Sequence, residues 1–525
     1  MKQTSEKLLN GTPRVQAAAN SYRSSSVFDQ AASGPEVMPR VCMMENHDAA
    51  YSVWRDAGVR SRVLIHIDAH HDMWWVPENS PTTIANFICP GLKEEMVREI
   101  FWVVPDQTWE LPTSRRAILR HLKEITAKYP ESQRATQAGD RRISTVVLGK
   151  PLTICSVDGL PLIDEDVLLD IDIDYLVIPY VSYRERDKHE PLPWRWPDEL
   201  LSRLRDRKVR SDLATISYSV EGGYTPLKWK YLGDEMAERL READRTGHLL
   251  NGTALLRAGA EASVGGDKEA AEGKYCEAIE ILPDFAAAHY HLALLYLETN
   301  RIAEARDCYQ RATAIDPSYK NALNTAGLLY QSNGHFQKFE CDLKRALQLD
   351  PEDAYGHYGI GRIAANRKQW DEAEASLDKS IAIDNQLIDA HRALGRLRVR
   401  QGRYDEAIQS YEWSMKLSLA GHAPLDGPII TNESNAESLK DPDHIRIHAR
   451  LAYLHDLKGE REKAIAGYRI SIAAGYDRPW VRARLARLYL KQGEWRKSTH
   501  ELWQAARSAL VASPQIIKCF PLRLR

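Results

Sequence analysis

The sequence predicts two different domains in one chain: an N-terminal α/β domain with a parallel sheet and helices on both faces, and a C-terminal all-α solenoid. Two observations predict this arrangement. Short, nearly continuous apolar runs rich in β-branched residues recur before residue 240, as in strands that are buried on both faces. A 34-residue period then governs the chain from residue 247 to 512. At 525 residues the chain is also too long for one hydrophobic core.

The composition excludes several classes of protein. The formal net charge of -2 gives no overall attraction to nucleic acid or to an anionic membrane. No segment approaches the roughly 18 apolar residues that a membrane span requires. Seven cysteines are scattered without a CxxC pair, which is typical of reduced thiols and predicts a cytoplasmic protein. Residues 1–39, rich in Ser, Ala and Gln, are predicted to form a flexible tail without a signal-peptide core.

The α/β domain is predicted to span residues 40–240. Apolar runs at 62–67, 167–173 and 214–218 predict its buried strands. Stretches with helical periodicity lie between them, at 92–100, 114–129 and 198–206. Strands that alternate with helices predict a parallel sheet with helices on both faces.

Acidic and imidazole side chains gather where two of these strands end. They are Asp68, His70, Asp72, Asp170, Asp172 and Asp174. Ligands collect at the carboxyl ends of parallel strands, and residues i and i+2 of an extended chain point the same way. Buried carboxylates repel one another unless cations lie between them, so the cluster predicts metal. Its oxygen-rich ligands favour Mn, Mg or Fe, and they suffice for two divalent ions. A lone DxD, by contrast, is often a solvated turn or a helix cap.

The same residues resemble a known family. The segment from Asp68 to Asp72 (DAHHD) resembles the DAHxD motif of the arginase/agmatinase, or ureohydrolase, family. The segment from Asp170 to Asp174 (DIDID) resembles its SxDxD motif, with Asp170 in place of serine. Together with SYSVEGGYTP at 217–226, they resemble a divergent ureohydrolase-like group that includes peptide arginases. The resemblance covers residues 41–240 and implies an arginase/deacetylase-like fold.

The resemblance also implies a set of metal ligands. His47 takes the place of the family's upstream histidine, although the two glycines that precede that histidine in the family are absent. One manganese would be held by His47, Asp68, Asp72 and Asp172. The other would be held by His70, Asp68, Asp172 and Asp174, with Asp68 and Asp172 as bridges. Composition alone leaves open which two of the acids at 170, 172 and 174 bind metal.

The implied reaction is hydrolysis of an arginine side chain to ornithine and urea. Glu221 matches the family's glutamate that pairs with the guanidinium, and Gly222 would let the backbone approach the substrate. A glycine turn with a solvent-facing glutamate is the alternative. Metal-bound Asp174 is the candidate for relaying a proton to the leaving amine. His71 and His66 are further candidates, or they are supporting and core residues.

Two tryptophans, Trp74 and Trp75, follow the first metal motif where free-arginine arginases carry small polar residues. Such rings cannot grip the α-carboxylate of an amino acid, whereas they can stack on a cationic side chain or a peptide. Core packing is the alternative interpretation. The departure favours arginine within a peptide over free arginine.

The 34-residue period of the second half resembles the tetratricopeptide repeat. Pro283, Pro317 and Pro351 keep this spacing, as do Gly361 and Gly395. Proline ends a helix, and small residues let two antiparallel helices cross closely. An inserted loop is predicted near 417–439. The groove of the array is predicted to hold a ribosomally made precursor peptide and so to raise its effective concentration at the metals.

Alternatives from other functional classes stay open at this point. A deacetylase-like amidohydrolase would use one zinc ion with two acids and one histidine. A chain whose hydrolase domain is degenerate would act as a tetratricopeptide adaptor. The repeats could also serve scaffolding or self-association into a homo-oligomer.

Overall fold

The computed structural model describes eight segments of the chain. They are residues 39–75, 82–137, 141–181, 191–220, 224–241, 247–320, 336–420 and 442–512. The predicted tail at 1–39 therefore lies outside the described residues except for residue 39, and most of the predicted insertion at 417–439 does too. Glu221 and Gly222 also lie outside them.

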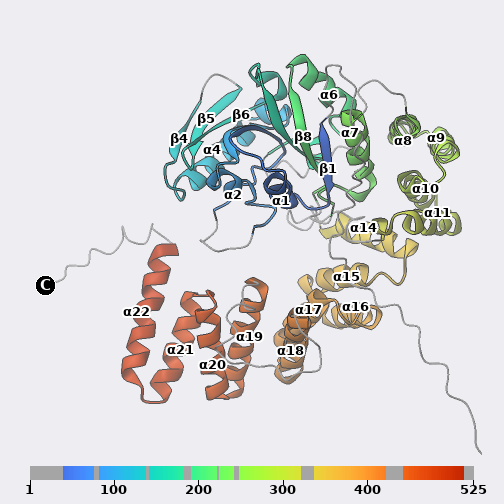
Figure 1. Ribbon diagram of the computed structural model, residues 1–525. Helices are drawn as coiled ribbons and strands as arrows, with labels where there is room; N and C mark the ends of the chain where they lie inside the picture. The colour runs from blue at the N-terminus through green and yellow to red at the C-terminus, as the bar shows by residue number, and fades with distance from the viewer. Residues whose placement is uncertain are drawn as a thin grey trace, which may run out of the picture. The chain divides into compact units, whose positions relative to one another are not determined.

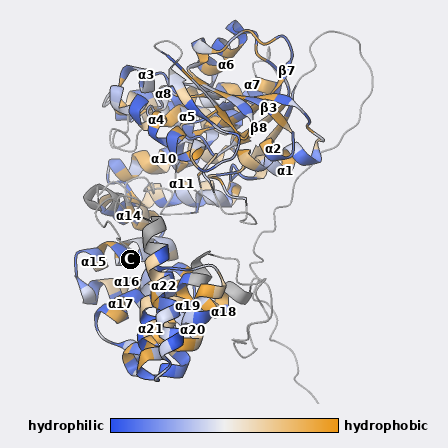
Figure 2. Ribbon diagram, turned by 90° about the vertical axis from the view of Figure 1, so that its left-hand side faces the viewer, coloured by the Kyte–Doolittle hydropathy of each residue, from blue (hydrophilic) through white to orange (hydrophobic). Residues whose placement is uncertain are grey.

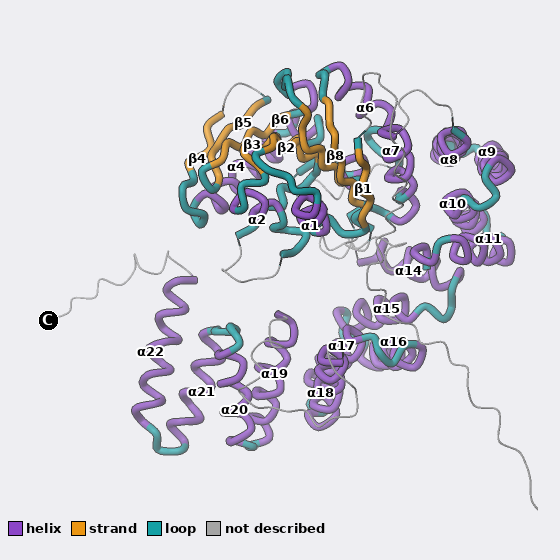
Figure 3. The backbone as a smooth tube through the Cα atoms, viewed as in Figure 1, coloured by secondary structure: helices purple, strands orange, loops and turns teal. Residues whose placement is uncertain are grey.

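The N-terminal domain is built on one eight-stranded sheet (Figures 1 and 3). Its strands are β1 (Arg40–Met44), β2 (Arg62–Ile67), β3 (Val97–Val103), β4 (Gln133–Gln137), β5 (Arg142–Val147), β6 (Lys150–Cys155), β7 (Asp166–Asp172) and β8 (Arg210–Ser217). The strand order is β1-β8-β7-β2-β3-β6-β5-β4. The first six strands in this order pair in parallel, as the apolar runs predict, whereas β5 and β4 add an antiparallel edge. The sequence does not predict this edge, because β4 is polar and mostly exposed and β5 is buried only at alternate positions.

Helices cover both faces of the sheet, and β2 shows why. Val63 and Ile65 pack into one apolar cluster with α6 (Pro197–Asp206) and α7 (Tyr231–Arg241). Leu64, which points the other way, packs into a second cluster. That cluster includes residues of α1 (Ala49–Asp56), α2 (Ile88–Lys93) and α4 (Pro112–Thr126). Figure 2, which is coloured by hydropathy, accordingly shows hydrophobic residues in orange along the strands between these helices.

One predicted helix is wrong. Residues 92–100 contain the end of α2, a turn and the start of β3. Val97, Ile100 and Trp102 are buried within the sheet's second cluster. Burial on a central strand outweighs the local helical pattern, since strand pairing depends on neighbours that are distant in sequence.

The C-terminal part is entirely helical in the residues that the structure describes. Its helices are α8 (His248–Val264), α9 (Lys268–Ile281), α10 (Ala286–Glu298), α11 (Ile302–Ile315), α14 (Phe336–Leu349), α15 (Ala354–Asn366), α16 (Trp370–Ile383), α17 (Ile388–Arg400), α18 (Tyr404–Ala420), α19 (Pro442–Lys458), α20 (Arg461–Ala473), α21 (Pro479–Lys491) and α22 (Trp495–Ala512). Apart from α14, they associate as consecutive pairs, such as α15 with α16 and α17 with α18.

The periodic glycines lie where paired helices cross. A Cβ atom on Gly361 would lie 2.8 Å from Leu377, and one on Gly395 would lie 3.0 Å from Tyr411. The small residue is therefore needed at both crossings, which confirms the physical reason for the period. The periodic prolines follow helix ends as predicted, since α9 ends two residues before Pro283.

The first repeats pack directly on the α/β domain. The carbonyl of Lys228 accepts a hydrogen bond from His291 Nε2 of α10, at 2.8 Å. Lys230 Nζ lies 2.8 Å from Asp316 Oδ2, just after α11. One apolar cluster continues from the sheet through Tyr231 into α8 to α11. These contacts make the two first helix pairs a structural extension of the α/β domain.

Within the described segments, no helix combines the length and the apolar character that crossing a membrane would require.

Two glycines of the first helix pair make a matched stability test. A Cβ on Gly259 in α8 would overlap the Tyr275 ring, whereas one on Gly273 in α9 meets no atom within 4 Å. We therefore expect Gly259→Ala to lower the free energy of unfolding by about 1–3 kcal/mol. Gly273→Ala should raise it by about 1 kcal/mol, because alanine favours the helix. Chemical denaturation measures both, and equal effects would contradict the packing.

Candidate metal centre

Four neighbouring strands deliver the polar side chains of the predicted site to one edge of the sheet. In the order β1-β8-β7-β2, His47 and Ser219 follow the first two strands, Asp172 ends β7, and Asp68 follows β2. All four side chains are buried. The sheet topology, and not the local sequence, therefore brings together residues that lie up to 172 positions apart, as in the contact of the Ser217 hydroxyl with the Glu45 carbonyl.

The residues after β2 converge through a tight turn. The spacing of Asp68, His70 and Asp72 predicts that they meet because the chain stays extended, yet β2 ends at Ile67. The His70 N–H donates to Asp68 Oδ1 at 2.6 Å, and Asp72 has a positive φ of 46°. Asp tolerates this left-handed conformation better than most residues do, because its short side chain can hydrogen-bond locally. A bend, and not the alternation of a strand, therefore aims these three side chains at one place.

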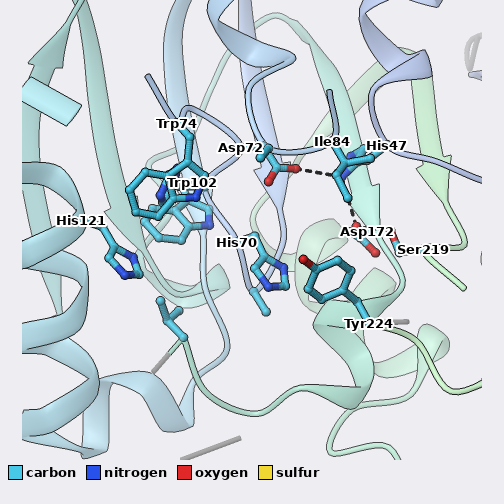
Figure 4. Close-up of a pocket in the computed structure, with 14 residues that line it drawn as sticks. His47, His70, Asp72, Trp74, Ile84, Trp102, His121, Asp172, Ser219 and Tyr224 are labelled. Atoms are coloured by element: carbon cyan, nitrogen blue, oxygen red, sulfur yellow. Dashed lines mark hydrogen bonds and ion pairs between the residues drawn. The ribbon is translucent and has the colours of Figure 1, made fainter. Parts of the chain in front are cut away.

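The first group of donor atoms surrounds His47. Its Nδ1 lies 3.3 Å from Asp72 Oδ2 and 3.1 Å from Asp172 Oδ2 (Figure 4). The same nitrogen lies 3.3 Å from Asp68 Oδ2. Neighbouring ligands of one ion with bonds of about 2.1 Å lie about 3.0 Å apart. The donor atoms of His47, Asp68 and Asp172 therefore lie close enough together to hold one cation, while Asp72 forms such a group with Asp68 and His66.

The second group shares a residue with the first. His70 Nδ1 lies 3.2 Å from Asp68 Oδ1 and 2.7 Å from Asp174 Oδ2. Asp68 thus directs one oxygen to each group, as a bridging carboxylate does. Asp172 directs Oδ2 to the first group, while its Oδ1 accepts the Asp174 N–H at 2.9 Å. The bridging role proposed for Asp172 therefore stays a prediction.

Asp170 lies behind the donor atoms and contacts His47 through Nε2, the ring nitrogen that faces away from the first donor group. Its Oδ2 is 2.9 Å from His47 Nε2 and 2.8 Å from His66 Nδ1, and its Oδ1 accepts from Thr215 at 2.5 Å. A proton on His47 Nε2 would leave Nδ1 with a free lone pair toward the carboxylates. Carboxylates commonly orient metal-binding histidines in this way. The geometry favours Asp172 and Asp174 as the ligands that face the donor groups.

The charges of the cluster are consistent with a divalent cation. Burial raises the pKa of Asp172 to about 7, and the carboxylates of Asp174 and Asp68 add to the rise. Burial alone would lower the pKa of His47, but Asp170 and the other carboxylates raise it well above its usual value. His47 Nδ1 and Asp68 Oδ2 are also buried without a hydrogen-bond partner. A cation would satisfy these atoms and offset the repulsion, so the residues present fit a metal site.

A pocket opens above the donor groups, and aromatic rings form its other side. His47, His70, Asp72 and Asp172 line the first side (Figure 4). The opposite side carries His71, Trp74, Trp102 and His121. The His71 ring lies 4.7 Å from that of Trp74 and 5.5 Å from that of His121. Tyr224 also lines the pocket, with its ring 4.7 Å from that of His70. Acidic oxygens on one side and π-faces on the other suit a cationic ligand.

The two predicted substrate-binding tryptophans differ in position. Trp74 lines the pocket, whereas Trp75 lies outside its lining and is 40% exposed. The ammonium of Lys128 lies 4.8 Å from the centre of the Trp75 ring.

Several residues of the site were missed in the sequence. The Ser219 hydroxyl donates to Asp172 Oδ2 at 2.5 Å, and the Trp102 indole donates to the Asp68 carbonyl at 3.0 Å. Tyr224 and His121 line the pocket. Ser219 and Tyr224 lie in the same motif as Glu221, at 217–226 after β8, so their place in the sequence was a usable signal. Trp102 and His121 carried none, since they reach the pocket from β3 and α4 through the fold.

Comparisons with known proteins bear on the helical part of the chain. Tetratricopeptide repeat models match residues 286–319, 324–388 and 390–419. The C-terminal half therefore contains tetratricopeptide repeats, as the period predicts. Repeats of this kind present extended binding surfaces, in many cases for proteins or peptides. No curated protein matches the chain.

Solved structures that resemble the chain are repeat proteins with low identity. A MamA structure labelled MSR-1 is 16% identical, covering 35% of this chain and 92% of its own, with a TM-score of 0.28. A tetratricopeptide repeat protein from Parabacteroides merdae is 17% identical over 49% of this chain and 93% of its own, with a TM-score of 0.25. YrrB, described as having an unusual peptide-binding site, is 17% identical over 42% and 97%, with a TM-score of 0.25. Likenesses of this size carry no argument about the site.

The contact between Asp170 and His47 predicts a supporting role that can be measured. Asp170→Asn keeps the shape of the side chain but removes the charge that orients the imidazole. We expect manganese affinity to fall about 10–100-fold, as for other residues that support a ligand. Titration calorimetry of the folded variant measures the change. Asp212→Asn, at an exposed ion pair with Arg62, is the control and should bind as the wild type does. Unchanged affinity in Asp170→Asn would contradict the role.

Proposed function

We propose that the α/β domain is a manganese-dependent peptide arginase. It would hydrolyse arginine side chains of a ribosomally made precursor peptide to ornithine and urea. One observation carries this proposal: two groups of ligand-spaced donor atoms share Asp68 beneath a pocket that has an aromatic wall. The resemblance of the two acidic motifs to those of ureohydrolases supports the same reaction.

The proposed ligands divide into two sets. His47, Asp68, Asp72 and Asp172 would hold one manganese, and Asp68, His70 and Asp174 would hold the other, with Asp172 as a further bridge. When bound, such a pair of cations activates water for attack and stabilises the charge that develops on the reacting group. Oxygen-rich sites with few imidazoles favour manganese over zinc, which supports this choice of metal.

The remaining pocket residues would bind and orient the guanidinium. Trp74 and Tyr224 present ring faces or edges within the pocket, and a guanidinium stacks well on such rings. His71 Nδ1 accepts the Met73 N–H at 3.0 Å, so its Nε2 carries the hydrogen and is free to donate. In this proposal the Nε2–H of His71 donates a hydrogen bond to the substrate. Asp174 is the candidate that would move a proton to the leaving amine, and Glu221 the candidate that would pair with the guanidinium.

The repeats would hold the rest of the peptide. A side chain alone offers few contacts for specificity, whereas a tethered peptide is presented at a raised effective concentration. The attachment of α8 to α11 on the α/β domain supports a combined binding unit.

Two other functions make different predictions. A deacetylase-like amidohydrolase would contain one zinc ion per chain, so metal analysis separates it from a two-manganese enzyme. A non-catalytic adaptor would bind its partner equally well without metal and would modify nothing.

The direct test is to incubate the manganese-loaded protein with arginine-containing peptides. Each hydrolysed arginine should lower the peptide mass by one CH2N2 unit and release urea. Asp68→Asn removes the shared carboxylate, and we expect activity to fall by at least about 1,000-fold. Mass spectrometry and a urea assay give the readout. Retention of full mass by every arginine peptide tested with fully loaded protein would reject the arginase reaction.

The two tryptophans provide a paired test of substrate contact. Trp74→Ala should raise KM for an arginine peptide about tenfold, because a ring contact with a cation contributes about 0.5–2 kcal/mol. Trp75→Ala should leave KM within about twofold, because that ring lies outside the lining of the pocket. Steady-state kinetics gives KM for both variants. A larger rise in KM for Trp75→Ala than for Trp74→Ala would contradict binding of the substrate in this pocket.

A further inference from the structure

The last helix of the described repeats, α22, exposes large apolar side chains along one side. Trp495 is 67% exposed, Leu502 52% and Trp503 60%. The second and third follow the first by seven and eight residues, which places all three on one side of a helix. We call Trp495, Leu502 and Trp503 the α22 stripe. Among the described helices, α22 packs on α21, beside it in Figure 1. Large apolar side chains that are grouped in water mark a surface for a partner.

Leu502 occupies a position of the repeat that the other helix pairs bury. Counting back by the period and the predicted insertion, the same position carries Tyr468 and Tyr411. The Tyr468 ring lies 6.3 Å from that of Trp480, on the first helix of the next pair. The residues at this position that are buried are Tyr275, Tyr309, Leu343, Leu377, Tyr411 and Tyr468. Leu502 therefore presents a surface that is covered by a helix elsewhere in the array.

Trp503 departs from the repeats in a second way. From α11 onward, the earlier second helices carry a polar or charged residue at its position. These residues are Gln310, Lys344, Asp378, Glu412 and Arg469. Polar side chains suit a surface that faces water, whereas an exposed indole leaves apolar area in contact with water. Because Trp503 is mostly exposed, it contributes little to the packing of its own pair, and tryptophan is enriched among the residues that anchor partners.

Positive charge borders the α22 stripe. Arg496 and Arg507 are exposed, and eleven residues, about three helical turns, separate them, so they lie on one side of α22. The Arg507 guanidinium lies 5.7 Å from the centre of the Trp503 ring. The acids nearest the stripe, Glu494 and Glu501, are in ion pairs with other residues of the chain. The border of the stripe therefore complements a partner that carries carboxylates.

A helix fits the α22 stripe better than a membrane surface does. Leu502 lies four residues after Ser498 and three before Ala505, which are both buried. Residues at these spacings are neighbours on a helix, so Leu502 lies next to the buried side of α22. A helix can lie beside α21 and reach both Leu502 and Trp503, whereas a flat bilayer would meet only the outermost side chains. The net charge of -2 also gives the chain no overall attraction to anionic lipids.

A second copy of this chain fits less well, because the charges repel. A twofold contact joins the same patch of two copies. Two antiparallel α22 helices with the stripe between them would bring Arg496 of each copy close to Arg507 of the other. Two parallel helices would bring each arginine close to its own equivalent. Like charges held together cost free energy, so the border of the stripe disfavours self-association.

We propose that the α22 stripe binds an amphipathic helix of a partner protein, with glutamate or aspartate beside the apolar side of that helix. Docking of one amphipathic helix on an apolar surface is a recurring mode of recognition. The tryptophans would act as anchors, and the partner's carboxylates would meet Arg496 and Arg507, since guanidinium groups bind carboxylates in a forked geometry. This binding does not depend on the reaction proposed for the α/β domain.

The test measures binding of a model helix to the full-length protein. The probe is a fluorescein-labelled peptide of about 20 residues, long enough to form a helix, with leucine at helical spacing and glutamate beside the leucines. We expect Leu502→Ala and Trp503→Ala each to weaken binding about tenfold in fluorescence anisotropy, because each removes an apolar anchor. Leu162→Ala and Trp413→Ala, at exposed residues outside α22, are the matched controls and should bind as the wild type does.

A second peptide, in which lysine replaces every glutamate, tests the charge of the partner. We expect the wild type to bind it about tenfold more weakly than the glutamate peptide, and the difference should shrink as salt is raised. A double variant with Arg496→Gln and Arg507→Gln should bind the two peptides equally and should still lose affinity when Trp503→Ala is added. Equal affinity of the wild type for both peptides would reject an acidic partner.

Other results would overturn the proposal outright. The first is no binding of the glutamate peptide by the wild type, or equal binding by Trp503→Ala protein whose circular dichroism spectrum matches that of the wild type. Tighter binding to vesicles of phosphatidylcholine and phosphatidylserine than to the peptide would make a membrane the partner. A dimer in sedimentation that Trp503→Ala dissociates would make a second copy the occupant. Peptide binding that appears only after removal of residues 513–525 would make that segment the occupant.

Discussion

The carboxylate of Asp68 constrains the whole α/β domain, because its two oxygens face two different groups of donor atoms. Oδ2 lies near His47 and Oδ1 near His70, and the side chain is completely buried. A charge in that position is tolerated only if everything around it is placed to compensate. The strand order, the bend after β2 and the polar contacts behind the site can all be understood as meeting that requirement.

Support for the site comes from residues that hold the candidate ligands in place. The Trp102 indole holds the Asp68 carbonyl, and Asp170 holds both His47 and His66. Thr215 in turn donates to Asp170 from the adjacent strand β8. These contacts connect β1, β2, β3, β7 and β8 through side chains as well as through the sheet. Rigid support of this kind fixes ligand geometry better than a loop can.

Much of the architecture could be predicted from the sequence, and the misses have physical causes. The apolar runs predict the parallel strands β2, β7 and β8, and the period of the glycines predicts the helix crossings at Gly361 and Gly395. The antiparallel edge formed by β4 and β5 and the strand β3 were not predicted, because their formation depends on pairing with strands that are distant in sequence.

The candidate site divides in the same way. Motif spacing identified the acids that follow β2 and those at the end of β7. It wrongly explained how the residues after β2 converge, since a bend and not an extended strand aims them. It also left the choice among Asp170, Asp172 and Asp174 open. Only the fold shows that Asp170 contacts two histidines from behind, and only the fold brings His121 from α4 to the pocket. Side chains that arrive from distant elements leave no local pattern to read.

The attachment of His291 and Asp316 to Lys228 and Lys230 has a consequence for how this chain can be divided. The segment from Tyr224 to Lys230 begins at the pocket and ends against the first repeats. An α/β domain transplanted into another protein would therefore have to carry α8 to α11 with it. Later helix pairs could be exchanged more freely, so that natural or engineered recombination can change the surface of the repeats without disturbing the candidate metal centre.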